Sequence, residues 1–335
     1  MSKKVLASAV VIFMTLLSGI TNVPEIEAVS YDGYLKEVYT SEKYNGSMPY
    51  RLYVPEDYDP NTKYPLVTFL HGAGERGTDN EKHINKPEYI TSRLIMTKKN
   101  KETYKCLIFA PQCPENEQWV DTPWANGNYS LSDVPESKSM KIAMELLDKI
   151  CSEYSVDNDR LYITGMSMGG FGTWDAIMRY PNKFAAAAPV CGAADPSMAG
   201  ILKEIPIRTY HGDKDDIVPV KGTRDMVKAL EDIGGNIAYT EYKNVMHSSW
   251  VNAYTDRELL PWMFEQRLSS RTIAEPTPTN DGQSDANTAT INPTSTDNDS
   301  GGGNGNNILL ILTITVAAII LVVIGALIIM KKKHK

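Results

Sequence analysis

The sequence has few cysteines and histidines and less positive than negative charge. Its 335 residues include four cysteines, five histidines and fewer Lys and Arg (34) than Asp and Glu (41). The cysteines, whose spacings match no metal site, are Cys106, Cys113, Cys151 and Cys191. If the chain is exported, these cysteines could form one or two disulfide bonds. Cys106 and Cys191 lie in apolar, strand-like runs, where buried free thiols are at least as well favoured.

Positive charge is scarcer still in the body of the chain. Residues 29–330 carry 28 Lys and Arg against 39 Asp and Glu, a net charge of −11. A domain this acidic is a poor partner for nucleic acid or for an anionic surface, because both repel it. We therefore expect no nucleic-acid partner.

Charge is absent from two apolar runs, one near each end. Lys3 and Lys4 precede the uncharged run 5–20, which is typical of an export signal. We expect residues 1–28 to be this signal, with an uncleaved anchor as the alternative. Residues 308–330 form a second uncharged run of 23 residues, long enough to cross a bilayer as a helix. A removed lipid-anchor signal is disfavoured by the basic residues that follow.

The basic residues 331–335 directly after the second run stay on the cytoplasmic side of a membrane. The body of the protein should therefore be extracellular and held at the cell membrane by a single-pass helix. Residues 271–307 are rich in Ser, Thr, Asn, Pro and Gly and have almost no large apolar side chains. They cannot bury a core, so we expect a flexible stalk. The remaining segment, 29–270, is the expected folded domain.

The folded domain should belong to the α/β class. With 42% hydrophobic residues, the chain can bury a sizeable core. Buried-type strands and helices alternate from residue 65 to 268, which indicates a mostly parallel sheet with helices on both faces. The expected strands are 50–54, 65–70, 107–110, 161–164, 184–190, 205–210 and 237–242; the clearest expected helices are 137–154, 171–179, 220–233 and 249–268.

The pattern Gly-x-Ser-x-Gly stands at residues 165–169, between an expected strand and an expected helix. That layout predicts a nucleophile elbow, in which a sharp turn lifts Ser167 out of the sheet. Gly165 and Gly169 suit positions where the backbone is crowded and a Cβ would clash. The first turn of the following helix directs N–H groups at the site, which favours developing negative charge.

A serine nucleophile needs a neighbouring base, and His247 is the best candidate of the five histidines. His71 and His211 each precede a glycine at a strand end, where a structural role is more natural. His83 lies in an irregular polar segment, and His334 lies in the basic tail. The order Ser167, then an aspartate near 215, then His247 is that of one type of serine triad.

Three aspartates compete for the third position of the triad: Asp213, Asp215 and Asp216. Spacing alone does not separate them, since aspartate is common in turns. Two backbone N–H groups are also needed to bind an oxyanion. We assign one to Met168, directly after the nucleophile, and the other to Ala73, in the glycine-rich loop after strand 65–70.

Three segments together resemble α/β-hydrolase serine esterases: residues 70–77 (Leu-His-Gly-Ala-Gly-Glu-Arg-Gly), 165–170 (Gly-Met-Ser-Met-Gly-Gly) and 211–219 (His-Gly-Asp-Lys-Asp-Asp-Ile-Val-Pro). The resemblance is to the polyhydroxybutyrate-depolymerase and feruloyl-esterase-like group, also described as predicted peptidases of the prolyl-oligopeptidase superfamily. It covers about residues 45–268. It implies the acid at Asp215 and an oxyanion donor at Ala73. The approach to His247 lacks the glycine often found there in the group.

The expected triad, this resemblance and the expected membrane anchor together predict a cell-surface carboxylic ester hydrolase. No cofactor and no metal are implied, because a serine triad needs neither. The expected substrate is an acyl ester, acetyl or feruloyl, of an extracellular polysaccharide. Trp119, Trp124 and Trp250 are candidate substrate contacts, although each is as readily an ordinary partly buried aromatic. A serine peptidase and a non-catalytic surface binding protein on the same scaffold are the alternatives.

Overall fold

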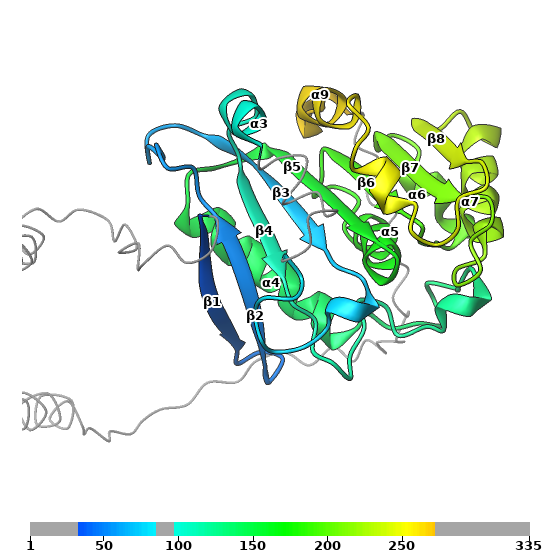
Figure 1. Cartoon of the computed structure of the whole chain (residues 1–335), viewed down its shortest axis with the longest axis horizontal. Helices are drawn as coiled ribbons and strands as arrows, with labels where there is room; N and C mark the ends of the chain where they lie inside the picture. The colour runs from blue at the N-terminus through cyan, green and yellow to red at the C-terminus, as the bar shows by residue number, and fades with distance from the viewer. Residues whose placement is uncertain (1–32, 85–96, 272–335) are drawn as a thin grey trace, which may run out of the picture. The chain divides into compact units, whose positions relative to one another are not determined.

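The structure is a computed structural model that describes residues 33–84 and 97–271 (Figure 1). In these residues eight strands form one sheet, in the order β1-β2-β4-β3-β5-β6-β7-β8. Their bounds are β1 Tyr34–Ser41, β2 Gly46–Tyr53, β3 Tyr64–Leu70, β4 Leu107–Pro111, β5 Val156–Met166, β6 Ala186–Val190, β7 Ile207–Gly212 and β8 Ile237–Tyr242.

Every pair of neighbouring strands from β4 to β8 in this order is parallel, whereas the β1–β2 and β2–β4 pairs are antiparallel. The expected α/β class and mostly parallel sheet are therefore confirmed. The sequence pattern did not predict β1. This strand is at the edge of the sheet, where Tyr34 and Leu35 are both buried and Val38 is 62% exposed. Its apolar residues therefore lack the alternation by which a half-buried strand is recognised.

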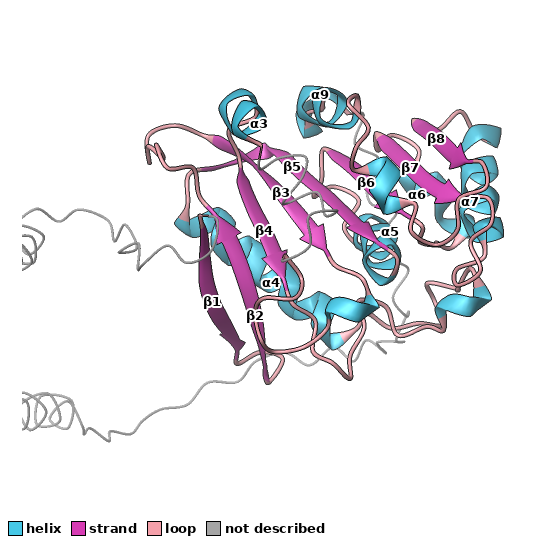
Figure 2. Cartoon of the chain, in the orientation of Figure 1, coloured by secondary structure: helices cyan, strands magenta, loops and turns pink. Residues whose placement is uncertain are grey.

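Helices cover both faces of the sheet (Figure 2). One face packs against α4 (Lys138–Glu153), α5 (Met168–Arg179), α6 (Ala199–Leu202) and α7 (Val220–Asp232). The other face packs against α8 (Trp250–Ala253) and α9 (Leu259–Glu265). The short helix α3 (Lys98–Thr103) precedes β4. Along β3, Leu66 and Leu70 belong to the first core, and Val67 and Phe69 belong to the second. The strand is thus buried on both sides, as its unbroken apolar run predicted.

The last expected helix, 249–268, is wrong as a single element. The structure divides this segment into α8, α9 and the 3-10 turn η4 (Leu268–Ser270). Pro261 gives a physical reason, because proline lacks a backbone N–H and disrupts a helix interior. In the structure Pro261 is the third residue of α9. It lies in the first turn, where a backbone N–H has no acceptor within the helix, so the lack of one costs nothing.

None of the helices in residues 33–84 and 97–271 has the length and apolar character needed to span a bilayer. The expected export signal, the transmembrane run 308–330, the basic tail and all but the first residue of the stalk 271–307 lie outside the described residues. The four cysteines are described and are free thiols, and Cys106, Cys113 and Cys191 are buried.

Candidate active site

Ser167 occupies the turn between β5 and α5. Its φ of 55° and ψ of −119° are a strained conformation for a residue with a side chain. Its amide N–H donates to Val190 O on β6 (2.9 Å), and its carbonyl accepts from Phe171 N–H in the first turn of α5 (3.0 Å). These bonds hold the strained turn in place and leave the side chain half exposed, as a nucleophile elbow requires.

The two glycines of the turn lie where the chain crosses itself closely. A Cβ on Gly165 would lie 2.4 Å from Gly169 O, and a Cβ on Gly169 would lie 1.9 Å from Leu70 O at the end of β3. Neither distance is compatible with a carbon atom, and both neighbours are backbone that cannot rotate away. The prediction that these positions need glycine is consistent with this crowding.

We predict that Gly169→Ala lowers the free energy of unfolding by about 3 kcal/mol or more, because α5 must move away from β3. Gly200→Ala is the matched control, since nothing lies within 4 Å of its added Cβ in α6. That control should be neutral or slightly stabilising, because alanine favours helix over glycine. Thermal unfolding followed by circular dichroism measures both. Equal melting temperatures for the two variants would contradict the prediction.

Ser167, His247 and Asp215 form one continuous chain of hydrogen bonds. Ser167 Oγ lies 2.8 Å from His247 Nε2. His247 Nδ1 lies 2.8 Å from Asp215 Oδ2 and 3.0 Å from Asp215 Oδ1. Because an ionised carboxylate can only accept, Nδ1 carries the proton and donates it to Asp215. Nε2 is then free to accept the proton of the Ser167 hydroxyl, which is the arrangement of a general base.

Asp215 is the aspartate that the structure places on His247, and its carboxylate is fully buried. Burial alone would raise the pKa of Asp215, but hydrogen bonds from His211, from His247 and from Val218 N–H hold it well below its usual value. Asp213 instead accepts the backbone N–H of Asn244 (2.6 Å). Asp216 is exposed. Of the three aspartates that spacing alone left open, Asp215, which the resemblance implied, is therefore the one that contacts His247.

Backbone contacts between two loops position His247. Lys214 N–H donates to Val245 O (3.0 Å), and Asp213 holds the N–H of Asn244 from the same side. Asn244 has a φ of 59°, a left-handed conformation that asparagine tolerates better than most residues. The turn before His247 is therefore made without a glycine.

The loop after β3 directs its backbone toward the same site. His71 Nδ1–H donates to Gly72 O (2.7 Å), and its Nε2 accepts from Cys113 N–H (2.9 Å). Burial lowers the pKa of His71 to about 4, so the ring stays neutral in this role. The peptide plane that carries Gly72 O also carries the N–H of Ala73, pointing the opposite way. Arg76 Nε donates to Ala73 O (2.9 Å), which holds the next peptide of the loop, between Ala73 and Gly74.

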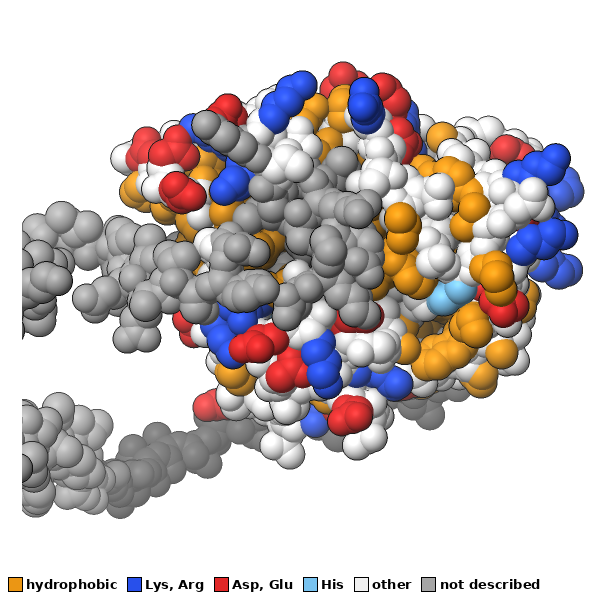
Figure 3. Space-filling view, in the orientation of Figure 1, with side chains coloured by type: hydrophobic (Ala, Val, Ile, Leu, Met, Phe, Trp, Pro, Cys, Tyr) orange, Lys and Arg blue, Asp and Glu red, His pale blue; other side chains and the backbone are white. Residues whose placement is uncertain are grey.

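A pocket of about 340 Å³ opens onto the Ser167 hydroxyl. Its walls include Ala73, Trp124, Ile217, His247 and Trp250. Figure 3 shows one histidine at the surface, bordered by hydrophobic side chains. It is His247, because the other three described histidines are completely buried. Two of the three tryptophans singled out in the sequence thus reach the pocket.

Trp119 has a different location. Its side chain is completely buried, and its indole N–H donates to His71 O (3.0 Å). It supports the loop after β3 from behind and does not line the pocket. We therefore leave Trp119 out of the proposed substrate contacts. Burial of this kind depends on tertiary packing, which the local sequence does not reveal.

Among the described residues, one group of side chains has the donor types for a metal ion: Cys191, Asp215 and His247, with ligand atoms within 4.8 Å of one another. The His247 and Asp215 atoms already bond to each other. Burial also raises the pKa of the Cys191 thiol to about 12, so the thiolate that a metal would need is strongly disfavoured. We assign no metal to this group.

The fold and the site together define the class: a serine hydrolase with the α/β-hydrolase fold. The chain belongs to the esterase family whose model carries the description "Putative esterase", which matches residues 41–294. This membership identifies the domain as that of a carboxylic ester hydrolase, as the resemblance of the sequence implied.

Three relatives illustrate this similarity. A bifunctional acetylxylan esterase/xylanase of Neocallimastix patriciarum is 28% identical over 54% of this chain and 23% of its own length. A poly(3-hydroxyalkanoate) depolymerase of Paucimonas lemoignei is 40% identical over 44% of this chain and 32% of its own. A solved thermostable esterase superposes with a TM-score of 0.64 at 38% identity, covering 70% of this chain and 64% of that one. The chain thus spans a third or less of both curated relatives.

Proposed function

We propose that this protein hydrolyses carboxylic esters through an acyl-enzyme formed on Ser167. The observation that carries the proposal is the unbroken hydrogen-bond chain from Ser167 Oγ through His247 to Asp215. A scaffold kept only for binding has no need of this chain, and loss of any member would have favoured the binding alternative. Membership of the esterase family supports the same reaction.

In the first half of the proposed reaction, Ser167 Oγ attacks the ester carbonyl carbon while His247 Nε2 takes the hydroxyl proton. Asp215 stabilises the imidazolium that forms. The carbonyl oxygen becomes an oxyanion and is bound by the N–H groups of Ala73 and Met168. When the intermediate collapses, the C–O bond to the alcohol breaks, and His247 returns its proton to the leaving oxygen.

In the second half, water enters the place of the alcohol. His247 takes a proton from this water, whose oxygen attacks the carbonyl carbon of the acyl-enzyme. The same N–H groups bind the second oxyanion. Collapse breaks the bond to Ser167 Oγ, which regains its proton from His247, and the carboxylic acid leaves. Each proton taken by His247 is returned, so the enzyme ends the cycle unchanged.

For the substrate we propose an acyl ester of extracellular polysaccharide, acetyl or feruloyl. The pocket volume is within the range of small-molecule sites, and its aromatic and aliphatic walls suit an apolar acyl group. The acetylxylan esterase relative supports a polysaccharide-linked ester. Turnover of p-nitrophenyl acetate, methyl ferulate and acetylated xylan by the full-length protein tests this. Cleavage of peptides without any ester turnover would favour the peptidase alternative instead.

Ile217 offers a test of the acyl pocket, because its side chain lines the pocket and is 47% exposed. We predict that Ile217→Ala lowers kcat/KM for methyl ferulate about fivefold, the effect of losing about 1 kcal/mol of apolar contact. Methyl acetate has the same alcohol and a much smaller acyl group, so we expect its kcat/KM to change less than about twofold. Val38→Ala, on the sheet edge, is the matched control. Equal losses for both esters would show that Ile217 does not contact the acyl group.

We further propose that the protein is exported by residues 1–28 and anchored by residues 308–330, with the stalk 271–307 between the membrane and the domain. The basic tail 331–335 supports this orientation. If so, the protein stays with membranes after an alkaline carbonate wash, and protease added outside intact cells releases the domain. Recovery of the full chain in the soluble fraction would contradict the anchor.

A further inference from the structure

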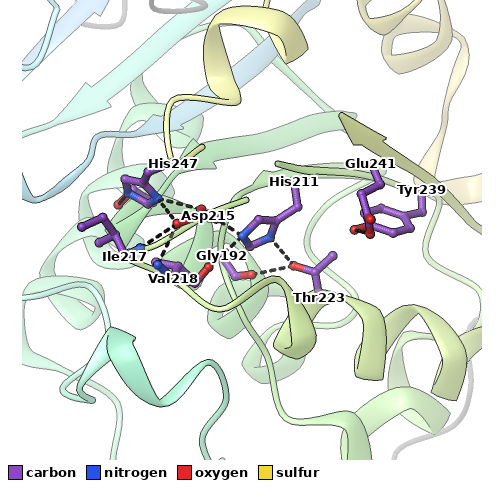
Figure 4. A network of polar contacts seen from close by, with 10 residues as sticks. Gly192, His211, Asp215, Ile217, Val218, Thr223, Tyr239, Glu241 and His247 are labelled. Atoms are coloured by element: carbon purple, nitrogen blue, oxygen red, sulfur yellow. Dashed lines mark hydrogen bonds and ion pairs between the residues drawn. The ribbon is translucent and has the colours of Figure 1, made fainter. Parts of the chain in front are cut away.

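A second histidine contacts the carboxylate of Asp215 (Figure 4). His211 lies near the end of β7, and its side chain is completely buried. Its Nε2 lies 3.0 Å from Asp215 Oδ2 and 3.1 Å from Val218 O. Its Nδ1 lies 2.7 Å from the Thr223 hydroxyl oxygen on α7. The buried carboxylate therefore lies between two imidazole rings, those of His247 and His211.

The partners of His211 determine how many protons its ring carries. The Asp215 carboxylate and the Val218 carbonyl can only accept, so Nε2 must donate. The Thr223 hydroxyl has a single proton, which it donates to Gly192 O (2.8 Å). Its oxygen can then only accept from Nδ1, so Nδ1 must donate as well. These four hydrogen bonds are made together only if His211 is an imidazolium cation.

We propose that His211 is a positively charged positioning residue for Asp215, an inference that rests on the proposed function of the triad. Its charge offsets that of the buried carboxylate, whose other oxygen is held by the N–H groups of Ile217 and Val218. These bonds fix the orientation of the Asp215 carboxylate. The positive charge of His211 also partly neutralises the negative charge that His247 faces. The balance limits how strongly Asp215 favours the protonated form of His247.

Other charged and titratable groups also face His211. Glu241 is its register partner on β8, and its carboxylate is paired bidentately with Arg224 of α7 (2.8 and 2.6 Å). Tyr239 donates to the same carboxylate (2.6 Å). The Cys191 thiol, directly after β6, lies near Asp215, and burial raises its pKa so that it stays neutral. Since Glu241 and Arg224 balance each other, Asp215 is the main counter-ion of His211.

We predict that His211→Gln shifts the acidic limb of the kcat/KM profile upward by about one pH unit. Glutamine can still donate toward Asp215 but carries no charge, so the uncompensated carboxylate favours protonated His247. A higher pH is then needed to free the base. His211→Phe removes the donor too and should lower kcat by about 100-fold through misplacement of Asp215. Both profiles are measured with p-nitrophenyl acetate on the full-length protein.

An unshifted limb in a folded His211→Gln protein would overturn the proposal, since a neutral, purely structural His211 predicts a loss of rate alone. A second measurement depends neither on the His211 variants nor on activity. Five histidines make ¹⁵N-histidine spectra of the Ser167→Ala chain simple to interpret. At about pH 8, where a free histidine is neutral, one histidine should carry protons on both ring nitrogens. If none does, the proposal fails even if the enzyme hydrolyses esters; if one does and no ester is cleaved, the proposed function fails instead.

Discussion

Ser167→Ala is expected to lower kcat for p-nitrophenyl acetate by about 10⁴-fold or more, to the rate supported by the remaining site. Ser167 Oγ lies 2.8 Å from His247 Nε2, and no other hydroxyl among the described residues is hydrogen-bonded to that nitrogen. Without Oγ there is no acyl-enzyme, and any residual rate reflects oxyanion binding and direct attack by water. KM should change little, because the walls of the pocket are intact. Initial rates at saturating substrate measure this directly.

Ser152→Ala is the matched control for this loss. Ser152 lies near the end of α4 and lines the same surface pocket as Leu161 of β5, and among the described residues its hydroxyl bonds only to Lys149 O of its own helix. The control should retain full activity and the same melting temperature. A Ser167→Ala protein that is folded and still hydrolyses esters within tenfold of wild type would contradict the proposed nucleophile.

The second large effect is expected for Asp215→Asn, which should lower kcat by about 10³- to 10⁴-fold. An amide can turn its NH₂ group toward His247 Nδ1, which then accepts instead of donating. The proton of the ring moves to Nε2, which no longer accepts from Ser167. The substitution also leaves His211 facing an uncharged group in a buried position, so some loss of stability should accompany the loss of rate.

Asp216→Asn controls for this second variant, because the neighbouring side chain is exposed and makes none of the bonds of the site. It should keep the wild-type rate. Asp213→Asn is the sharper comparison, since Asp213 holds Asn244 N–H in the loop of His247. An asparagine oxygen can still accept that bond, so only a small effect is expected. A larger loss for Asp213→Asn than for Asp215→Asn would reassign the triad acid.

The alternation of buried strands and helices predicted the fold class, because strands covered on both faces have unbroken apolar runs, as in β3. The Gly-x-Ser-x-Gly pattern predicted where Ser167 lies, since the crowding around Gly169 is imposed by the turn itself. The order of Ser167, an aspartate near residue 215 and His247 predicted that three such side chains meet, and the resemblance to the esterase group implied that the aspartate is Asp215. The carboxyl ends of β5, β7 and β8 lie along one edge of the sheet, and this brings them together.

Other features depend on packing that local patterns do not encode. Trp119 and Trp124 occur five residues apart in the same polar loop, yet one is completely buried and the other lines the pocket. His211 was expected to be structural because a glycine follows it, and nothing in the sequence pairs it with Asp215. That contact arises because the chain reverses its direction after β7, which brings Asp215 against the ring of His211, four residues earlier.

The most direct test of the central claim is covalent labelling of the full-length protein with a serine-directed organophosphorus probe, followed by peptide mass mapping. The account predicts one probe molecule per chain, attached to Ser167 and absent from Ser167→Ala. Labelling should also be much slower in His247→Ala, because the probe reports the activated hydroxyl. A folded wild-type protein that takes up no probe, or takes it up on another serine, would contradict the claim that Ser167, His247 and Asp215 form a catalytic triad.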